Sequence, residues 1–166
     1  CLRRRKKQNY RHHRNSTYYS IRANAFDYEK MAMGRERLEY YINDYKAKKA
    51  DGTISNVEDD ELKDMRIVQE MYARGFEFVP IDIYKAKARS FQIIDGKIMP
   101  SFKVISKVGE SAGESIEIAA RDGEFLSKDD LRQRARIGQT VIEKLGELGL
   151  LDGMAESNQL SLFDVI

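Results

Sequence analysis

The sequence predicts an α+β fold that is mainly helical, with one small β-hairpin between two groups of helices. Apolar residues recur at helical spacing over most of the chain, and they alternate with a period of two only between positions 76 and 100. The 166 residues suffice for one domain, or one and a half, and 42% apolar with 34% charged residues is typical of a folded protein. No apolar run reaches the roughly 18 residues that a membrane span requires, so we expect no membrane partner.

Two helices are expected before position 76. Asp27 is the predicted N-cap of the first helix, which ends in the polar stretch 46–55. The second helix runs from about Glu58 to Arg74, and Gly75 stands at its left-handed C-cap. Its apolar face consists of Leu62, Met65, Val68 and Tyr72. The acidic run at its start complements the positive end of the helix dipole, and we prefer this interpretation to a metal site.

The period-two segment predicts short strands. Residues 76–84 are expected to form one strand, because Val79, Ile81 and Ile83 share a face. A hairpin should follow over residues 90–102, with Asp95-Gly96 as its turn. Two or three short strands do not form a stable sheet by themselves, so we expect them to pack against the helices.

Three further helices complete the prediction. The first covers residues 111–121, Ser127 opens the second with Asp130 as its capping-box partner, and the third spans 140–148 before Gly149.

Residues 104–121 have the layout of a helix-hairpin-helix, with the hairpin at Lys107-Val108-Gly109-Glu110. The glycine lets the turn close, Val108 packs beneath it, and the amides at the following helix start can bind a phosphate oxygen without reading base sequence. The usual hairpin is glycine-apolar-glycine, and Lys107 replaces the first glycine, which weakens the amide cradle but adds a charge. Lys103, Lys107 and Arg121 are candidate phosphate contacts. An ordinary helical hairpin serving the core is the alternative.

The segment 131–148 repeats this layout more loosely around Arg136-Ile137-Gly138-Gln139. Together the two segments predict a tandem helix-hairpin-helix-like C-terminal domain that can straddle both strands of a duplex. The second segment is locally basic, which supports duplex contact, and Arg136, Gly138 and Lys144 are its candidate DNA-binding residues.

The two ends of the chain differ from its body. Residues 1–14 carry seven Lys or Arg and no acid, whereas the rest has a net charge of −5. We interpret the leader 1–16 as a disordered or mis-joined end, with a nucleic-acid patch as the alternative. Because the first residue is Cys1 rather than Met, we expect a fragment, and a single cysteine indicates an intracellular protein.

At the other end, a polar spacer precedes Gln159, Leu160, Ser161, Leu162 and Phe163. Such a tail either folds back on its own domain or binds a partner groove, with Leu160, Leu162 and Phe163 in apolar pockets and the Gln159 amide fixing the register. The residues alone leave both possibilities open.

QLSLF resembles the pentapeptide by which bacterial replication proteins bind the sliding clamp. Together with VGESAG, GEFLSKDDL and ESNQLSLF, it makes the chain similar to the C-terminal end of the PolC-type DNA polymerase III alpha subunit, from about Phe26 to Phe163. Residues 1–16 depart from the family pattern, as does Lys107.

The resemblance implies a non-catalytic part of a DNA-directed DNA polymerase, a nucleotidyltransferase of DNA replication. Val108, Gly109 and Ser111 would lie in the DNA-facing hairpin, and residues 159–163 would bind the clamp. The implied partners are primer–template double-stranded DNA, the bacterial sliding clamp and other replisome subunits, in the cytoplasm at the nucleoid. The family's magnesium-binding carboxylates lie upstream, so we expect no catalytic residue, metal or cofactor in this chain.

The expected organisation has four parts: leader 1–16, the end of a fingers-type helical region 17–75, a duplex-binding domain 76–150 and a flexible tail 151–166. The alternative function is a stand-alone clamp-binding module that does not bind DNA. An independent hydrolase is disfavoured, because the only histidines, His12 and His13, lie in the leader.

Overall fold

The computed structural model describes residues 25–157, and the chain in it forms two compact units. Within the described part, unit 1 comprises residues 25–80 and 91–100, and unit 2 comprises 81–90 and 101–157. The hairpin segment therefore belongs with the N-terminal helices, not with the C-terminal ones as we expected. The mainly helical α+β prediction is confirmed.

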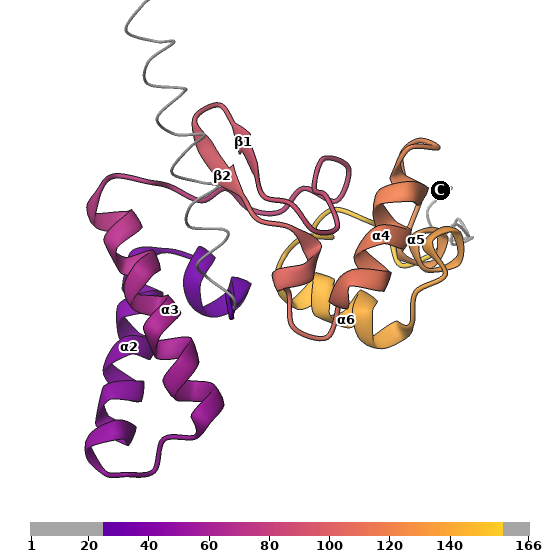
Figure 1. The fold of residues 1–166 in the computed structure, drawn as a ribbon. Helices are drawn as coiled ribbons and strands as arrows, with labels where there is room; N and C mark the ends of the chain where they lie inside the picture. Colours follow the sequence, from indigo (N-terminus) through magenta and orange to yellow (C-terminus); the bar gives the residue numbers. More distant parts are fainter. Residues whose placement is uncertain (1–24, 158–166) are drawn as a thin grey trace, which may run out of the picture. The chain divides into compact units, whose positions relative to one another are not determined.

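Unit 1 begins with a short π-helix, η1 (Tyr28–Ala32), followed by the long helix α2 (Arg35–Ala50) (Figure 1). The prediction of one helix from Asp27 is wrong, because Asp27 caps only η1, where its side chain accepts from the Lys30 amide at 3.0 Å. Gly34 then takes φ = 108°, which interrupts the helical backbone before α2. Helix α2 also continues to Ala50, because the lysines and alanines at its end are good helix formers.

Helix α3 (Asn56–Ala73) runs beside α2. It begins with a capping box, in which Ser55 and Glu58 satisfy each other's backbone amides at 3.1 and 3.2 Å. The helix therefore starts two residues earlier than expected, and the acidic run stands at its capped end as predicted. Gly75 follows with φ = 83°, which confirms the left-handed cap.

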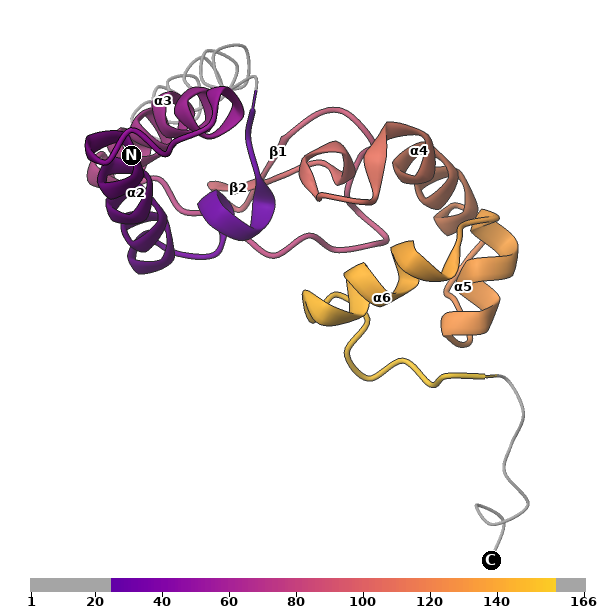
Figure 2. The ribbon, with the colours of Figure 1, turned by 90° about the horizontal axis from the view of Figure 1, so that it is seen from below.

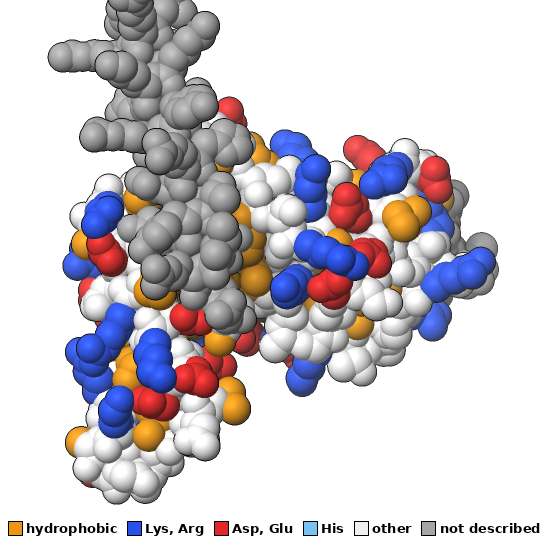
Figure 3. Space-filling view, viewed as in Figure 1, with side chains coloured by type: hydrophobic (Ala, Val, Ile, Leu, Met, Phe, Trp, Pro, Cys, Tyr) orange, Lys and Arg blue, Asp and Glu red, His pale blue; other side chains and the backbone are white. Residues whose placement is uncertain are grey.

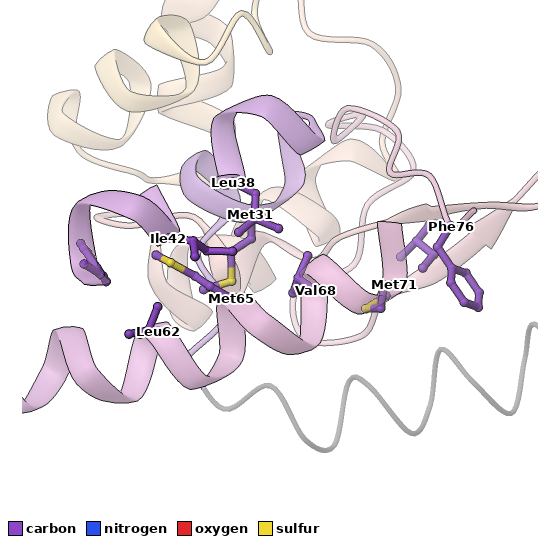
Figure 4. Close-up of a cluster of buried hydrophobic side chains, with 10 residues drawn as sticks. Met31, Leu38, Ile42, Leu62, Met65, Val68, Met71 and Phe76 are labelled. Atoms are coloured by element: carbon purple, nitrogen blue, oxygen red, sulfur yellow. The ribbon is translucent and has the colours of Figure 1, made fainter. Parts of the chain in front are cut away.

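The core of unit 1 lies between η1, α2 and α3, and Figure 4 shows Met31, Leu38, Ile42 and Met65 directed toward one another. The hairpin contributes Ile98, which is 1% exposed. The buried members are Met31, Leu38, Ile42, Tyr45, Leu62, Met65, Val68, Met71, Phe76 and Ile98.

The predicted strand over 76–84 is wrong. Only a bridge between Phe78 and Ile98 forms, with Val79 N donating to the Ile98 carbonyl at 2.8 Å. Pro80 has no amide hydrogen to continue a ladder, and the Asp82 carboxylate accepts from the Tyr84 amide at 2.8 Å, which turns the chain.

The predicted hairpin is confirmed, with β1 (Gln92–Ile94) pairing antiparallel to β2 (Lys97–Met99). Asp95 and Gly96 at its turn have φ values of 51° and 80°. Two successive positive values are the signature of the tight hairpin turn that an Asp-Gly pair favours.

Unit 2 contains the 3-10 helix η2 (Phe102–Val104) and the helices α4 (Gly109–Ala120), α5 (Lys128–Ala135) and α6 (Gln139–Glu147) (Figure 2). Ser127 caps α5 as predicted, accepting from the Asp130 amide at 3.0 Å. Gly149 follows α6 with φ = 74°, again as predicted. None of the helices within residues 25–157 is long and apolar enough to cross a membrane.

Candidate nucleic-acid interface

The first hairpin joins η2 to α4 through two left-handed residues. Lys107 has φ = 67° and Gly109 has φ = 70°, and Val108 between them is only 5% exposed. Val108 thus packs beneath the turn, as predicted. Lys107 occupies a conformation that suits glycine, which agrees with its place at the first glycine of the usual hairpin.

The start of α4 carries negative charge beside this hairpin. Glu110 lies in the first turn of α4, and Arg89 pairs with Glu110 at 2.7 Å and with Glu114 at 2.5 Å. These hydrogen-bonded carboxylates raise the pKa of Arg89. Sequence analysis missed Arg89, because nothing in its local pattern indicates that it reaches a helix some twenty positions onward. The negative charges of Glu110 and Glu114 disfavour the binding of a phosphate at this helix start.

The exposed candidates around the first hairpin are Lys103, Lys107 and Ser111. No ion pair from the described part of the chain engages either lysine. Arg121, at the far end of α4, pairs loosely with Glu117 at 3.5 Å and remains largely exposed.

The second hairpin presents a helix start without acids. Arg136 ends α5 with φ = 52°, and Gly138 is the N-cap of α6 with no side-chain cap. Ile137 between them is buried. The exposed residues around it are Arg136, Gly138, Gln139 and Thr140. The structure therefore brings Arg136 and Gly138 together at the N-terminus of α6, where backbone amides and the helix dipole favour an anion.

The third predicted DNA-binding residue of this segment, Lys144, is less available than the sequence suggested. Lys144 is 7% exposed, and this burial argues against its predicted phosphate contact. A sequence signal existed, since Lys144 lies three residues after Val141 and four before Leu148, on the apolar stripe of α6. On the face shown in Figure 3, lysines and arginines over α4–α6 are interspersed with acids and do not form one basic field.

The predicted clamp-binding residues Gln159, Leu160, Ser161, Leu162 and Phe163 lie outside the described residues, as does the leader 1–16. The described part of the tail is held on the domain, which was not expected. Leu151 is 3% exposed, and the carbonyls of Ala155 and Glu156 accept hydrogen bonds from the start of α5. Within residues 25–157, no three His, Cys, Asp or Glu side chains gather where they could hold a metal ion.

Two hairpins, each with a buried apolar residue beneath a left-handed turn, define a helix-hairpin-helix protein. A family model described as a helix-hairpin-helix motif matches residues 75–160, and the chain belongs to this family. Over 147 residues, or 89% of its length, the chain is 42% identical to the PolC-type DNA polymerase III of Streptococcus suis (strain 98HAH33).

Two other relatives give the same result. Identity is 42% to the PolC-type DNA polymerase III of Streptococcus pyogenes serotype M2 (strain MGAS10270) and 40% to that of Streptococcus pneumoniae serotype 2 (strain D39 / NCTC 7466), again over 89% of the chain. The resemblance to PolC-type polymerases is confirmed. The chain spans about 10% of the length of these relatives, so it corresponds to one part of a replicative DNA polymerase.

Proposed function

We propose that this chain is the duplex-binding and clamp-tethering part of a bacterial replicative DNA polymerase, working in the cytoplasm at the nucleoid. The observation that carries the proposal is the uncapped, acid-free start of α6 beside Arg136, within a helix-hairpin-helix region. Polymerisation itself, with its magnesium ions, is assigned to other parts of the polymerase.

The second hairpin is the stronger phosphate site of the two. Its first turn has no acid, and Arg136 adds a charge beside the amides. At the first hairpin, Glu110 and Glu114 lie close by and occupy Arg89, so Lys107 must offset them. We therefore expect Arg136 to contribute more to duplex affinity than Lys107.

Contacts of this kind recognise the sugar–phosphate backbone and are independent of base sequence. A polymerase must hold whatever duplex it has just synthesised, so sequence-independent binding fits the proposed place in replication. The tail supplies a second attachment, through Leu160, Leu162 and Phe163 in apolar pockets of the clamp.

Duplex binding is tested by titrating the chain onto a labelled 20-base-pair duplex between about 50 and 200 mM salt. Arg136→Asn removes one charge, and asparagine tolerates the left-handed backbone at this position. Loss of one phosphate contact should weaken binding by about three- to tenfold and reduce the salt slope by about one. Arg74→Gln, an equal charge change at the C-cap of α3 in unit 1, is the matched control and should leave affinity nearly unchanged.

Clamp binding is tested with a bacterial sliding clamp and the double variant Leu162→Ala, Phe163→Ala. Two lost anchors should cost about 2 kcal/mol or more each, and the binding should respond little to salt. Clamp binding without any duplex binding would support the stand-alone module instead. If neither partner binds, the proposal is overturned.

A further inference from the structure

The last described residues form a clasp on the first turn of α5. The Lys128 amide donates to the Ala155 carbonyl at 2.8 Å, and the Asp129 amide donates to the Glu156 carbonyl at 3.1 Å. The Glu156 carboxylate also pairs with the Lys128 ammonium at 2.6 Å. We use the word clasp for these three contacts.

The two backbone contacts are the stronger part of the clasp, because they satisfy amides at the start of α5. The first amides of any helix have no acceptor within it. In α5 the Asp130 amide is satisfied by the Ser127 hydroxyl, and the two amides before it are satisfied by the tail. The side-chain pair adds less, because the Glu156 side chain is 83% exposed and solvent screens the attraction.

We infer that the clasp fixes the point at which the C-terminal tail leaves unit 2, so that only Ser157 and Asn158 tether the segment beginning at Gln159. Without the clasp, the nearest buried anchor is Leu151, and seven residues, 152–158, would form the tether. The inference rests on the proposed function only in naming the sliding clamp as the ligand of that segment.

The difference in tether length has a calculable effect. A random coil of two residues spans about 8 Å and one of seven residues about 15 Å. Once a tether is longer than the distance it must span, effective concentration falls roughly as the −3/2 power of its length, so release of the clasp lowers it by at most about sixfold. The clasp thus keeps the clamp segment close to the α5–α6 hairpin that we propose binds duplex.

Lys128→Pro removes two of the three contacts of the clasp with little harm to the helix. Lys128 is the first residue of α5, where proline is favoured, and Ser127 before it has the extended backbone (φ −164°, ψ 171°) that a following proline requires. The variant removes both the donor amide and the ammonium. Lys128→Gln is the matched control, because it keeps the amide and loses only the ammonium.

The direct measurement is the distance distribution between spin labels at Glu143→Cys on α6 and Ser157→Cys directly after the clasp, both exposed positions, in a Cys1→Ser background. We expect a narrow distribution for the parent chain, a slightly wider one for Lys128→Gln and a clearly wider one for Lys128→Pro. Equal widths in all three, with helix content preserved by circular dichroism, would overturn the inference.

Amide hydrogen exchange gives an independent test without a substitution in α5. Truncation after Ser157 keeps the clasp, so the Lys128 and Asp129 amides should exchange as slowly as in the parent chain. Truncation after Met154 removes both acceptor carbonyls, so the same amides should exchange at least tenfold faster. Equal exchange rates in the two truncations would also overturn the inference.

Measuring binding to the sliding clamp distinguishes a failure of this inference from a failure of the proposed function. Lys128→Pro should bind the free clamp as the parent chain does, but should lose up to about sixfold in affinity for a clamp loaded on duplex. If no variant binds the clamp, the proposed function fails, and the label distances still decide the clasp. If the clamp binds and the distributions are equal, only the clasp fails.

Discussion

The guanidinium carbon of Arg134 lies 4.5 Å from the centroid of the Phe125 ring. The same guanidinium donates hydrogen bonds of 2.9–3.1 Å to the carbonyl oxygens of Ala119, Gly123 and Glu124. It therefore ties the end of α4 and the following loop to α5. Its charge, which the sequence placed in a basic segment favouring DNA, is used inside the domain.

Replacing Arg134 should therefore destabilise unit 2. Arg134→Lys keeps the charge but cannot reach several carbonyls with one planar fork, so we expect a loss of about 2–3 kcal/mol in the free energy of unfolding. Urea unfolding measures it. Arg132→Lys is the control, because Arg132 is exposed and pairs only loosely with Asp129 at 3.8 Å, and it should stay within about 0.5 kcal/mol of the parent. Equal effects of the two substitutions would contradict the structural role of Arg134.

Gly113 permits η2 to approach α4 closely. A Cβ atom built on Gly113 would lie 2.7 Å from the Cβ of Phe102, which is completely buried. We expect Gly113→Ala to cost about 1–3 kcal/mol, since the core must shift and the gain in helix propensity offsets only part of this. Thermal unfolding monitored by circular dichroism measures it.

Gly146→Ala in α6 is the matched control. A Cβ there meets no atom within 4 Å, and the substitution should stabilise the chain by about 0.5–1 kcal/mol through helix propensity alone. A gain in stability at both positions would show that η2 and α4 do not pack as described.

Replacing Lys107 with glycine, the residue usual at this position of the hairpin, should increase the free energy of unfolding. A side chain at φ = 67° costs about 1–2 kcal/mol, and Lys107→Gly removes that cost while making the unfolded chain more flexible. We expect a net stabilisation of about 0.5 kcal/mol in urea unfolding. The reverse change, Gly109→Ala at φ = 70°, should destabilise by about 1–2 kcal/mol although its Cβ would meet nothing within 4 Å. The left-handed backbone at both positions requires the two substitutions to change the free energy of unfolding in opposite directions.

Alkaline pH should weaken unit 1 through a partly buried cluster of Lys30, Tyr45 and Glu61. The Lys30 ammonium donates to Tyr45 Oη and to Glu61 Oε2, both at 2.9 Å, and the Tyr45 hydroxyl donates to Glu61 at 2.7 Å. Burial acts to lower the pKa of Lys30, but hydrogen bonds to Tyr45 and Glu61 outweigh it and raise that pKa above its usual range. Burial raises the pKa of Tyr45.

Both folded-state pKa values exceed the unfolded ones, so both groups contribute stability that is complete below about pH 10 and lost as the pH rises further. The urea midpoint should fall steeply between about pH 10 and pH 11.5. Lys30→Met should flatten this fall, whereas Lys46→Met, at an exposed position on α2, should not. Identical pH profiles for the two variants would exclude the cluster as the cause.

Signals that act within a few residues were read correctly from the sequence. Ser127 begins α5 and Gly75 ends α3 through local side-chain or backbone geometry, and Asp95-Gly96 sets its own turn. The break at Gly34 and the failed strand beyond Phe78 were missed, because periodicity continues through both. Whether a glycine or a proline breaks a helix or strand within an apolar pattern can be decided only when the neighbouring elements are known.

For the candidate site, the two hairpins were predicted and the availability of their charges was not. Whether a basic side chain is available to a phosphate depends on ion-pair partners distant in sequence, as with Arg89 and Glu110, or on packing, as with Lys144. The clasp has no sequence signal, because main-chain carbonyls provide the contacts to α5. The clamp-binding residues remain a prediction from the sequence.

The chain passes between the two units three times, near residues 80, 90 and 100, and Ile98 is part of the core of unit 1. Neither unit is therefore an uninterrupted stretch of sequence. During synthesis on the ribosome, α2 and α3 emerge well before the residue that completes their core. The core is complete only once the hairpin has left the exit tunnel, by which time the first ten residues of unit 2 have also emerged.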